Sequence, residues 1–317
     1  MILYSLPILA ASLILIMLIS DRLIRYVLVL SRAVGLSEMA AGFVLLSIIT
    51  SLPELSMSTV ASLAGEGDLS VGNVLGSNIA NLTIILGLAI LFSRKNIKIG
   101  GQSQKELVQF LFLTSIIPLF IVQQGTLGPV LGIILLIMFI YFGVTVSRKT
   151  QTTPKEEPLQ QKNENLAFVV VKFLIGIGLV IFLSDFAVES SIDIAGFIGL
   201  PTSIIGATII GLGTSLPELA TTIQALKQGL YNMALGNLLG SCITNITLIL
   251  GVTSLLSVSE VNVVAVQSIM FYVLISSLSV WYMISSNERI TKKSAIFLCL
   301  IYVVFILQQI GVSVVIF

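Results

Sequence analysis

Apolar runs of about 18 or more residues, long enough to cross a bilayer as helices, follow one another along almost the whole chain. Mean hydropathy is +1.09 and only 10% of the 317 residues are charged, whereas soluble domains carry about 25%. The first run, Ile2–Ile19, lacks the basic start and cleavage site of a signal peptide, so we interpret it as a retained span. The sequence therefore predicts an all-α, multi-pass protein of the cell membrane.

Ten membrane spans account for these runs. They are predicted at 2–20, 39–63, 71–93, 106–123, 127–147, 166–186, 201–226, 235–257, 262–285 and 293–316. With this count the basic residues all fall on one side, and the opposite connections carry only acidic residues. The positive-inside rule then makes the basic connections cytoplasmic and places both termini outside. Asp21 and Asp185 are predicted to lie at the ends of the first and sixth spans, as interfacial or helix-end charges.

The sequence contains an internal duplication. TSLPEL occurs at Thr50–Leu55 and again at Thr214–Leu219, and the same offset along the chain aligns two copies of GN-x-LGS-x3-N without a gap. Each half holds five predicted spans, an odd number, so the second half enters the membrane from the opposite side. We therefore predict two inverted repeats, 1–147 and 166–317, joined by a polar cytoplasmic linker at 148–165. Inverted repeats are the architecture of secondary transporters, which bind ions near the membrane midplane.

Two glutamates, Glu54 and Glu218, lie in the middle of otherwise apolar spans. A charged side chain at the centre of a spanning helix costs about 2.5–3.5 kcal/mol on insertion scales. No lysine or arginine occurs in the four predicted spans that carry the repeated motifs, so neither acid has a basic partner there. A bound cation is the natural substitute, and the pair is predicted to form a cation site.

Further oxygen atoms are predicted to gather around the two acids. Pro53 and Pro217 lack an N–H group, which frees the carbonyls four residues earlier, those of Ile49 and Gly213. Hydroxyls and amides that recur at helical spacing in the motifs come from Thr50, Thr214, Ser77, Ser241, Asn81 and Asn245. This all-oxygen set suits a hard cation such as Ca²⁺, and monovalent ions can fill the same oxygens. Histidine-dependent zinc sites are excluded because the chain contains no histidine.

Both copies of G-x7-TSLPEL followed by GN-x-LGS-x3-N resemble the alpha repeats of the cation/Ca²⁺ exchanger superfamily, particularly its sodium/calcium exchanger branch. The resemblance spans essentially the whole chain. It implies ten helices in inverted halves and Ca²⁺ ligation by Glu54 and Glu218 with backbone oxygens of Thr50 and Thr214. The Na⁺ sites and flanking positions that it implies involve Ser51, Ser215, Ser77, Ser241, Asn81 and Asn245. Some relatives carry aspartate at position 245, and the neutral amide here argues against potassium co-transport.

The predicted function is secondary active exchange of Ca²⁺ for Na⁺ by alternating access, with Glu54 and Glu218 as shared ligands. A Ca²⁺/H⁺ antiporter using the same glutamates is the first alternative, and a cation channel is a weaker one. Ca²⁺ and Na⁺ are expected as substrates rather than cofactors. The lipid bilayer is the expected partner, with no nucleic acid and no obligatory protein partner. The chain lacks histidine, and Cys242 and Cys299 lie in apolar runs, so we predict neither an enzyme nor a disulfide.

Overall fold

The computed structural model describes residues 2–33, 46–92, 97–98, 102–150, 166–227, 231–256, 258–286 and 289–311. Helices of the first half are α1 (Ile2–Ala33), α3 (Leu46–Thr50), α4 (Leu52–Leu63), α5 (Gly67–Ala80), π-helix η2 (Asn81–Ile85), α6 (Leu86–Phe92), α7 (Gln102–Ile116), α8 (Leu119–Gln124) and α9 (Pro129–Thr150). Helices of the second half are α10 (Leu166–Ile198), α11 (Thr202–Ile205), π-helix η3 (Gly206–Ile210), α12 (Gly211–Thr214), α13 (Leu216–Lys227), α14 (Tyr231–Thr244), π-helix η4 (Asn245–Ile249), α15 (Leu250–Leu256), α16 (Val263–Ser286) and α17 (Lys292–Gln309).

Six helical segments within the described ranges are long and apolar enough to cross a membrane. They are Gly67–Phe92, Leu166–Ile198, Thr202–Leu226, Ala234–Leu256, Val263–Ser286 and Lys292–Gln309. Shorter apolar stretches occupy Tyr4–Ser20 of α1 and Pro129–Thr145 of α9. The predicted span 106–123 is divided between α7 and α8, where Pro118 supplies no N–H group to a continuous helix. The all-helical membrane architecture is confirmed, while the count of ten spans and the side of the termini stay predictions.

The first and sixth predicted spans continue past the acidic residues that were expected to end them. Helix α1 runs to Ala33 and α10 to Ile198, so Asp21 and Asp185 lie inside helices and not at helix ends, while their position at the membrane interface stays a prediction. A charge lowers local hydropathy but does not interrupt helical hydrogen bonding, and neither glycine nor proline lies between Asp21 and Ala33. Helix α9 likewise continues to Thr150, into the first residues of the predicted linker, and 151–165 lie outside the described residues.

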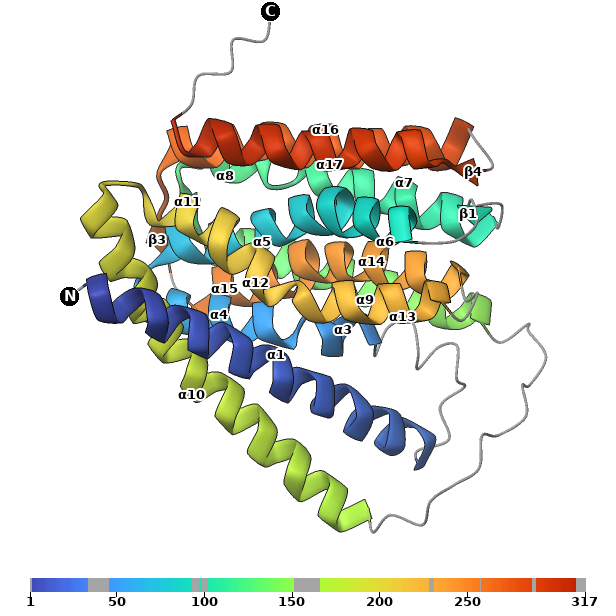
Figure 1. Ribbon diagram of the computed structural model, residues 1–317, viewed down its shortest axis with the longest axis horizontal. Helices are drawn as coiled ribbons and strands as arrows, with labels where there is room; N and C mark the ends of the chain where they lie inside the picture. Colours follow the sequence, from blue (N-terminus) through green and yellow to red (C-terminus); the bar gives the residue numbers. More distant parts are fainter. Residues whose placement is uncertain are drawn as a thin grey trace, which may run out of the picture.

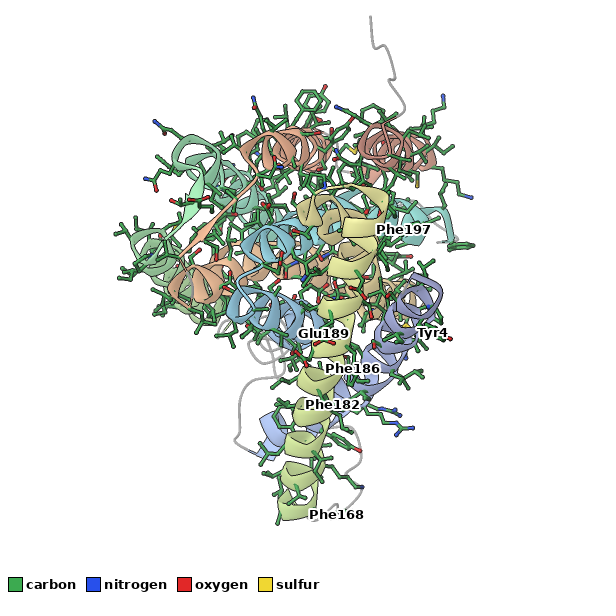
Figure 2. The ribbon with its side chains drawn as sticks, turned by 90° about the vertical axis from the view of Figure 1, so that its left-hand side faces the viewer. Tyr4, Phe168, Phe182, Phe186, Glu189 and Phe197 are labelled. Carbon is green, nitrogen blue, oxygen red and sulfur yellow. The ribbon has the colours of Figure 1, made fainter. Side chains whose placement is uncertain are left out.

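Helices α1 and α10 form an outlying pair. They pack along each other and diverge from the other helices over much of their length (Figure 1). Figure 2 shows α10 extending away from the remaining helices, with Phe168, Phe182 and Phe186 along it. These three side chains are exposed, and exposed apolar surface of this kind suits contact with lipid.

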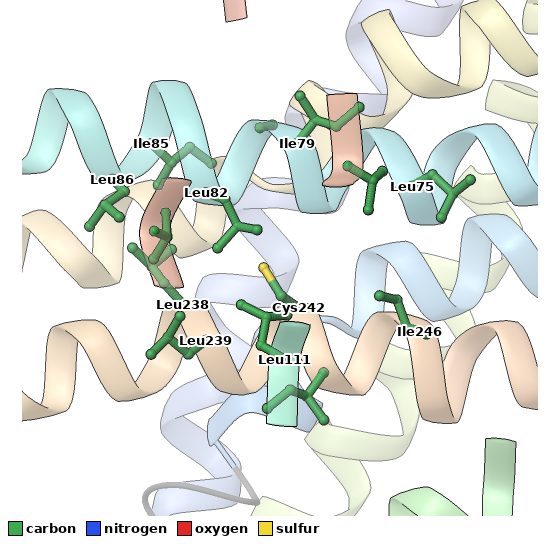
Figure 3. Packing of buried hydrophobic residues seen from close by; sticks show 14 of the residues in the cluster. Leu75, Ile79, Leu82, Ile85, Leu86, Leu111, Leu238, Leu239, Cys242 and Ile246 are labelled. Carbon is green, nitrogen blue, oxygen red and sulfur yellow. The ribbon is translucent and has the colours of Figure 1, made fainter. Parts of the chain in front are cut away.

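The continuous helices α5–η2–α6 and α14–η4–α15 form the centre of the molecule. In each, 83% of the most apolar 18-residue stretch is buried inside the protein, compared with 17% for the corresponding stretch of α10. One core of buried apolar side chains includes Leu75, Ile79 and Leu82 from the first helix and Leu238 and Leu239 from the second (Figure 3). Because these helices contact protein rather than lipid, they can carry buried polar groups at membrane depth.

The structure repeats the duplication found in the sequence. The π-helix η2 begins at Asn81 and η4 at Asn245, which are equivalent positions of the two motifs, and each π-helix is five residues long. In Figure 1, α5 and α6 follow one another from left to right, whereas α14 and α15 follow one another from right to left. Corresponding helices therefore run in opposite directions, as expected for inverted repeats.

Two short antiparallel ribbons join the halves. Strand β1 (Ile97–Lys98) pairs with β4 (Arg289–Ile290), and β2 (Thr126–Leu127) pairs with β3 (Ser259–Glu260). Each ribbon thus takes one strand from each half. In Figure 1, strands β1 and β4 lie at one end of the molecule and strand β3 lies at the other.

Glycines bring α5 into direct backbone contact with the segment α11–η3–α12. A Cβ atom added at Gly72 would lie 2.1 Å from the carbonyl oxygen of Ser203, and one at Gly76 would lie 2.2 Å from that of Ala207. From the opposite side, a Cβ atom at Gly206 would lie 2.6 Å from the carbonyl oxygen of Leu69. No side chain fits between these backbones, so α5 is held directly against the interrupted helix that leads to Glu218.

Candidate cation site

The helices that carry the glutamates are interrupted just before them. Ser51 separates α3 from α4, with φ −85° and ψ 12°, and Ser215 separates α12 from α13, with φ −85° and ψ 6°. Pro53 and Pro217 stand two residues later, at the second position of the following helix. Since proline lacks an N–H group but is tolerated in a first helical turn, each helix stops and restarts at this point. The same local sequence thus produces the same turn in both halves.

Both glutamate side chains are completely buried, with 0% of their surface exposed. The hydroxyl of Ser215 donates a hydrogen bond to Oε1 of Glu54 at 2.9 Å, so the Glu54 side chain reaches the turn just before Glu218. Oε2 of Glu54 and both carboxylate oxygens of Glu218 have no hydrogen-bond partner among the described residues. Burying carboxylate oxygens without partners is costly, and a cation held by both side chains would offset that cost.

Thr50 contacts the opposite half of the molecule. Its hydroxyl oxygen lies 3.1 Å from Oγ of Ser241, and it donates a hydrogen bond to Oδ1 of Asn237 at 3.4 Å. The hydroxyls of Thr50 and Ser241 lie beside the carboxylate of Glu218. This corner of the site therefore combines a residue of the first half with three residues of the second.

Thr214, the counterpart of Thr50 in the second repeat, makes the matching contacts. Its hydroxyl donates a hydrogen bond to Oδ1 of Asn73 at 3.2 Å and lies 3.4 Å from Oγ of Ser77. The hydroxyls of Thr214 and Ser77 lie beside the carboxylate of Glu54. Each glutamate thus faces the threonine of the other half, and the site has the same construction on both sides of the repeat interface.

Just before the turn at Ser215, the carbonyl of Gly211 gains a side-chain donor from the first half, whereas the sequence pointed to the carbonyl of Gly213. The hydroxyl of Ser77 donates to the carbonyl oxygen of Gly211 at 3.1 Å. In an unbroken helix that oxygen would accept from the N–H group of Ser215, but the turn directs this N–H group to Gly213 instead. In the first half the N–H group of Ser51 keeps its helical bond to the carbonyl oxygen of Ser47 at 3.1 Å, so the two repeats differ in the hydrogen bonding of this turn.

Asn81 and Asn245 begin the π-helices η2 and η4 and are buried, with 0% and 1% of their surface exposed. Nδ2 of Asn245 donates a hydrogen bond to Oδ1 of Asn78 at 3.1 Å, and its own Oδ1 has no partner among the described residues. Neither amide atom of Asn81 has a hydrogen-bond partner in the same part of the chain. π-Helical turns occur frequently at functional sites, and both turns here present an amide with unused hydrogen-bonding capacity.

All ten predicted site residues are at most 1% exposed. They are Thr50, Ser51, Glu54, Ser77, Asn81, Thr214, Ser215, Glu218, Ser241 and Asn245. Hydrogen-bonding contacts join three pairs of them across the halves or helices, and Oγ of Ser51 has no partner among the described residues. The described residues contain no cluster of three or more His, Cys, Asp or Glu side chains placed to hold a metal ion together. The donor set is therefore two carboxylates with hydroxyls and amides, which suits a hard cation.

Sequence reasoning missed three buried asparagines of the site. Asn73 donates to the carbonyl oxygen of Glu54 at 3.2 Å and to Oγ of Ser58 at 2.9 Å, and so fixes the start of α4. Asn237 accepts from Thr50, as described above. Both asparagines belong to the aligned GN-x-LGS motifs, and that repetition was a signal that could have identified them. Asn78 has no counterpart asparagine in the second half, so the repeat gave no sign of it.

Replacing Ser215 by alanine is expected to lower the free energy of unfolding by about 2 kcal/mol, since hydrogen bonds to charged groups contribute about 1.5–3 kcal/mol. The matched change Ser51→Ala is expected to have almost no effect, because Oγ of Ser51 has no partner to lose among the described residues. Chemical unfolding of both variants in detergent, without Na⁺ or Ca²⁺, measures the difference. Equal losses would show that the bond from Ser215 to Glu54 does not persist in solution.

A membrane-embedded helical protein, duplicated in opposite directions and with a carboxylate pair buried between the halves, has the architecture of a secondary transporter. A sequence profile described as sodium/calcium exchanger protein matches residues 4–148 and 168–311. The chain belongs to this family, whose members are exchangers and not enzymes.

Individual relatives cover most of the chain. Inner membrane protein YrbG of Escherichia coli (strain K12) is 31% identical over 81% of this chain and 81% of its own length. Sodium/calcium exchanger MaX1 of Methanosarcina acetivorans is 28% identical over 90% of this chain and 93% of its own. A solved structure of the sodium-calcium exchanger NCX_Mj matches with a TM-score of 0.64 and 26% identity, covering 96% of this chain and 98% of that one. The fold is therefore that of an exchanger which moves cations across a membrane.

Proposed function

We propose that this protein is a secondary active antiporter of the cell membrane that exchanges Ca²⁺ for Na⁺ by alternating access. The observation that carries the proposal is the pair of buried glutamates, in which three of the four carboxylate oxygens lack donors among the described residues. The chemistry of related proteins agrees with it. MaX1 is named a sodium/calcium exchanger, and NCX_Mj crystals were soaked with Na⁺ and Ca²⁺ or Sr²⁺.

Glu54 and Glu218 are proposed as ligands shared by both ions. Together they neutralise one Ca²⁺, and backbone oxygens of Thr50 and Thr214 complete its coordination, since Ca²⁺ takes about six to eight oxygen ligands. For Na⁺, a smaller charge is matched by neutral hydroxyls, supplied by Ser51, Ser215, Ser77 and Ser241, with Asn81 and Asn245 at the flanks. Because both ions need the same two carboxylates, the binding of one excludes the other.

This competition couples the movement of Ca²⁺ to that of Na⁺. An empty site leaves two buried carboxylates near each other without a counter-charge, a state that low-dielectric surroundings make costly. Occupied by Ca²⁺ or by Na⁺, the site loses that cost and is free to change the side to which it opens. Since the two halves have opposite directions and matching contacts, each access state can reuse the contacts of the other half.

The membrane arrangement belongs to the same proposal. The repeats are 1–147 and 166–317, the linker 148–165 and the basic connections face the cytoplasm, and ten spans place both termini outside. The distribution of the basic and acidic residues supports this orientation.

Uptake of ⁴⁵Ca²⁺ into proteoliposomes tests the function, with vesicles loaded with Na⁺, K⁺ or acidic buffer at a clamped membrane potential. We expect uptake only with internal Na⁺. Uptake driven only by internal acid would make the protein a Ca²⁺/H⁺ antiporter in which the buried glutamates carry protons. Uptake down the Ca²⁺ gradient with any internal solution would indicate a channel and overturn exchange.

A further inference from the structure

We propose that Asn78 is a positioning residue that presets the side chain of Asn245 to offer its amide oxygen to the transported cation. The inference rests on the proposed cation site and adds to it a residue outside the duplicated set. It rests on two consecutive hydrogen bonds between the central helices that fix the amide of Asn245. It also rests on the absence of equivalent bonds to Asn81 among the described residues.

The chain of hydrogen bonds has only one possible direction. Nδ2 of Asn78 donates to the carbonyl oxygen of Cys242 at 3.0 Å, and Oδ1 of Asn78 accepts from Nδ2 of Asn245 at 3.1 Å. A backbone carbonyl can only accept, so Asn78 must turn its NH₂ group toward Cys242 and its oxygen toward Asn245. Asn245 must then present its own NH₂ group to Asn78. The orientation of both amides therefore follows from one backbone carbonyl.

The amide oxygen of Asn245 is left free by this arrangement. It is buried and has no hydrogen-bond donor among the described residues, although an unpaired buried acceptor costs about 1–3 kcal/mol. Asn245 follows Ser241 by four residues, and Ser241 lies against Thr50 beside Glu218. A cation near Glu218 would give this oxygen the partner that it lacks.

The first half lacks the equivalent device within the described residues. The alignment that pairs Thr50 with Thr214 also pairs Asn78 with Cys242, and Asn81 with Asn245. Figure 3 shows the thiol of Cys242 directed from α14 toward the α5–η2 helix. The thiol lies beside Asn81, but neither amide atom of Asn81 has a partner with hydrogen-bond geometry in this part of the structure. A thiol is a weak hydrogen-bonding group, so it cannot set the orientation of an amide.

The amides of Asn81 and Asn245, at equivalent positions of the two repeats, therefore differ in how firmly their orientation is fixed. Asn245 is held as an acceptor, while Asn81 can turn either its oxygen or its NH₂ group to the site. The inferred consequence is that Asn245 contributes to cation affinity only as long as Asn78 holds it.

The test uses purified protein in detergent, where Ca²⁺ binding raises the unfolding temperature according to its dissociation constant. Asn78→Cys installs the residue that the second half carries at this place and is expected to raise the half-saturating Ca²⁺ concentration about tenfold. Asn245→Ala is expected to raise it by a similar factor. The double variant is expected to show no further increase, because a residue that acts through another adds nothing once the second is gone.

Ser62→Ala is the matched control. The hydroxyl of Ser62 donates a buried hydrogen bond between helices to the carbonyl oxygen of Thr253 at 3.0 Å, as Asn78 does to Cys242. Its loss is expected to lower the unfolding temperature without changing the half-saturating Ca²⁺ concentration. If Asn78→Cys behaves in this way, Asn78 is merely structural and the inference is overturned. If the increases in half-saturating Ca²⁺ concentration of the two single variants multiply in the double variant, the inference is overturned as well. Asn78→Ala replaces Asn78→Cys in the test if Asn78→Cys does not fold.

The readout is independent of transport. Absence of Na⁺-driven uptake by the wild type would defeat the proposed exchange, yet Ca²⁺ binding and its dependence on Asn78 would still be measurable. Absence of any Ca²⁺ effect on wild-type unfolding would overturn the cation site and this inference with it.

Discussion

Glu54→Gln and Glu218→Gln are each expected to lower Na⁺-driven Ca²⁺ uptake by a factor of about one hundred or more. Leaving a buried charge without its partner costs about 3–5 kcal/mol, and every 1.4 kcal/mol is about tenfold in affinity. Here the uncompensated charge is that of the cation, which keeps only one of two carboxylates. Initial rates of ⁴⁵Ca²⁺ uptake into Na⁺-loaded proteoliposomes measure the effect.

The substitutions change charge and leave size almost unaltered, so the fold is expected to survive. In Glu54→Gln, the amide oxygen can still accept the hydrogen bond from Ser215. In Glu218→Gln, a buried carboxylate without partners among the described residues is removed, so the unfolding temperature without Ca²⁺ is expected to stay level or rise. Glu189→Gln makes the same change on an exposed residue of α10 (Figure 2) and is expected to keep wild-type uptake. Wild-type uptake by Glu218→Gln would remove Glu218 from the site.

Gly76→Ala is expected to lower the free energy of unfolding by about 3 kcal/mol, at the upper end of what overpacking usually costs. The added Cβ atom would lie 2.2 Å from the carbonyl oxygen of Ala207, and helical backbones hold both atoms in place, so neither can rotate away. Helix α5 would have to separate from η3, and this moves Ser77 away from Gly211 and Thr214. Exchange is therefore expected to fall together with stability.

Gly178→Ala provides the control, because a Cβ atom at this glycine of α10 meets nothing within 4 Å. Replacing an uncrowded helical glycine by alanine usually gains about 0.5–1 kcal/mol. Thermal unfolding of the two variants in the same detergent is thus expected to shift in opposite directions. A Gly76→Ala variant as stable as the wild type would contradict the close backbone contact.

The two candidate glutamates could be identified from the sequence because their chemistry conflicts with their surroundings. A glutamate in an apolar span requires a reason, and finding the same glutamate in both copies of one motif supplied it. A local disturbance of the helices near Pro53 and Pro217 could also be predicted, since proline acts on the backbone locally, but the turns at Ser51 and Ser215 were not. All ten predicted residues lie in buried positions.

Contacts between the halves could not be predicted in the same way. Nothing in the sequence pairs Thr50 with Asn237, because these residues meet only after two inverted halves have packed together. Asn78 was missed for a related reason. Site residues were chosen because the two repeats share them, and Asn78 differs from its counterpart Cys242. The lengths of α1 and α10 were underestimated because hydropathy reports the surroundings of a helix rather than its ends.

The two ribbons affect how the chain matures during synthesis. Each ribbon pairs a strand of the first half with a strand of the second: Ile97–Lys98 with Arg289–Ile290, and Thr126–Leu127 with Ser259–Glu260. Neither ribbon can therefore form until the second half has left the ribosome. Until then the first half inserts with unpaired strand edges and with Glu54 lacking the donor that Ser215 later provides. The nascent first half is therefore an incomplete intermediate, and the contacts between the halves form late in synthesis.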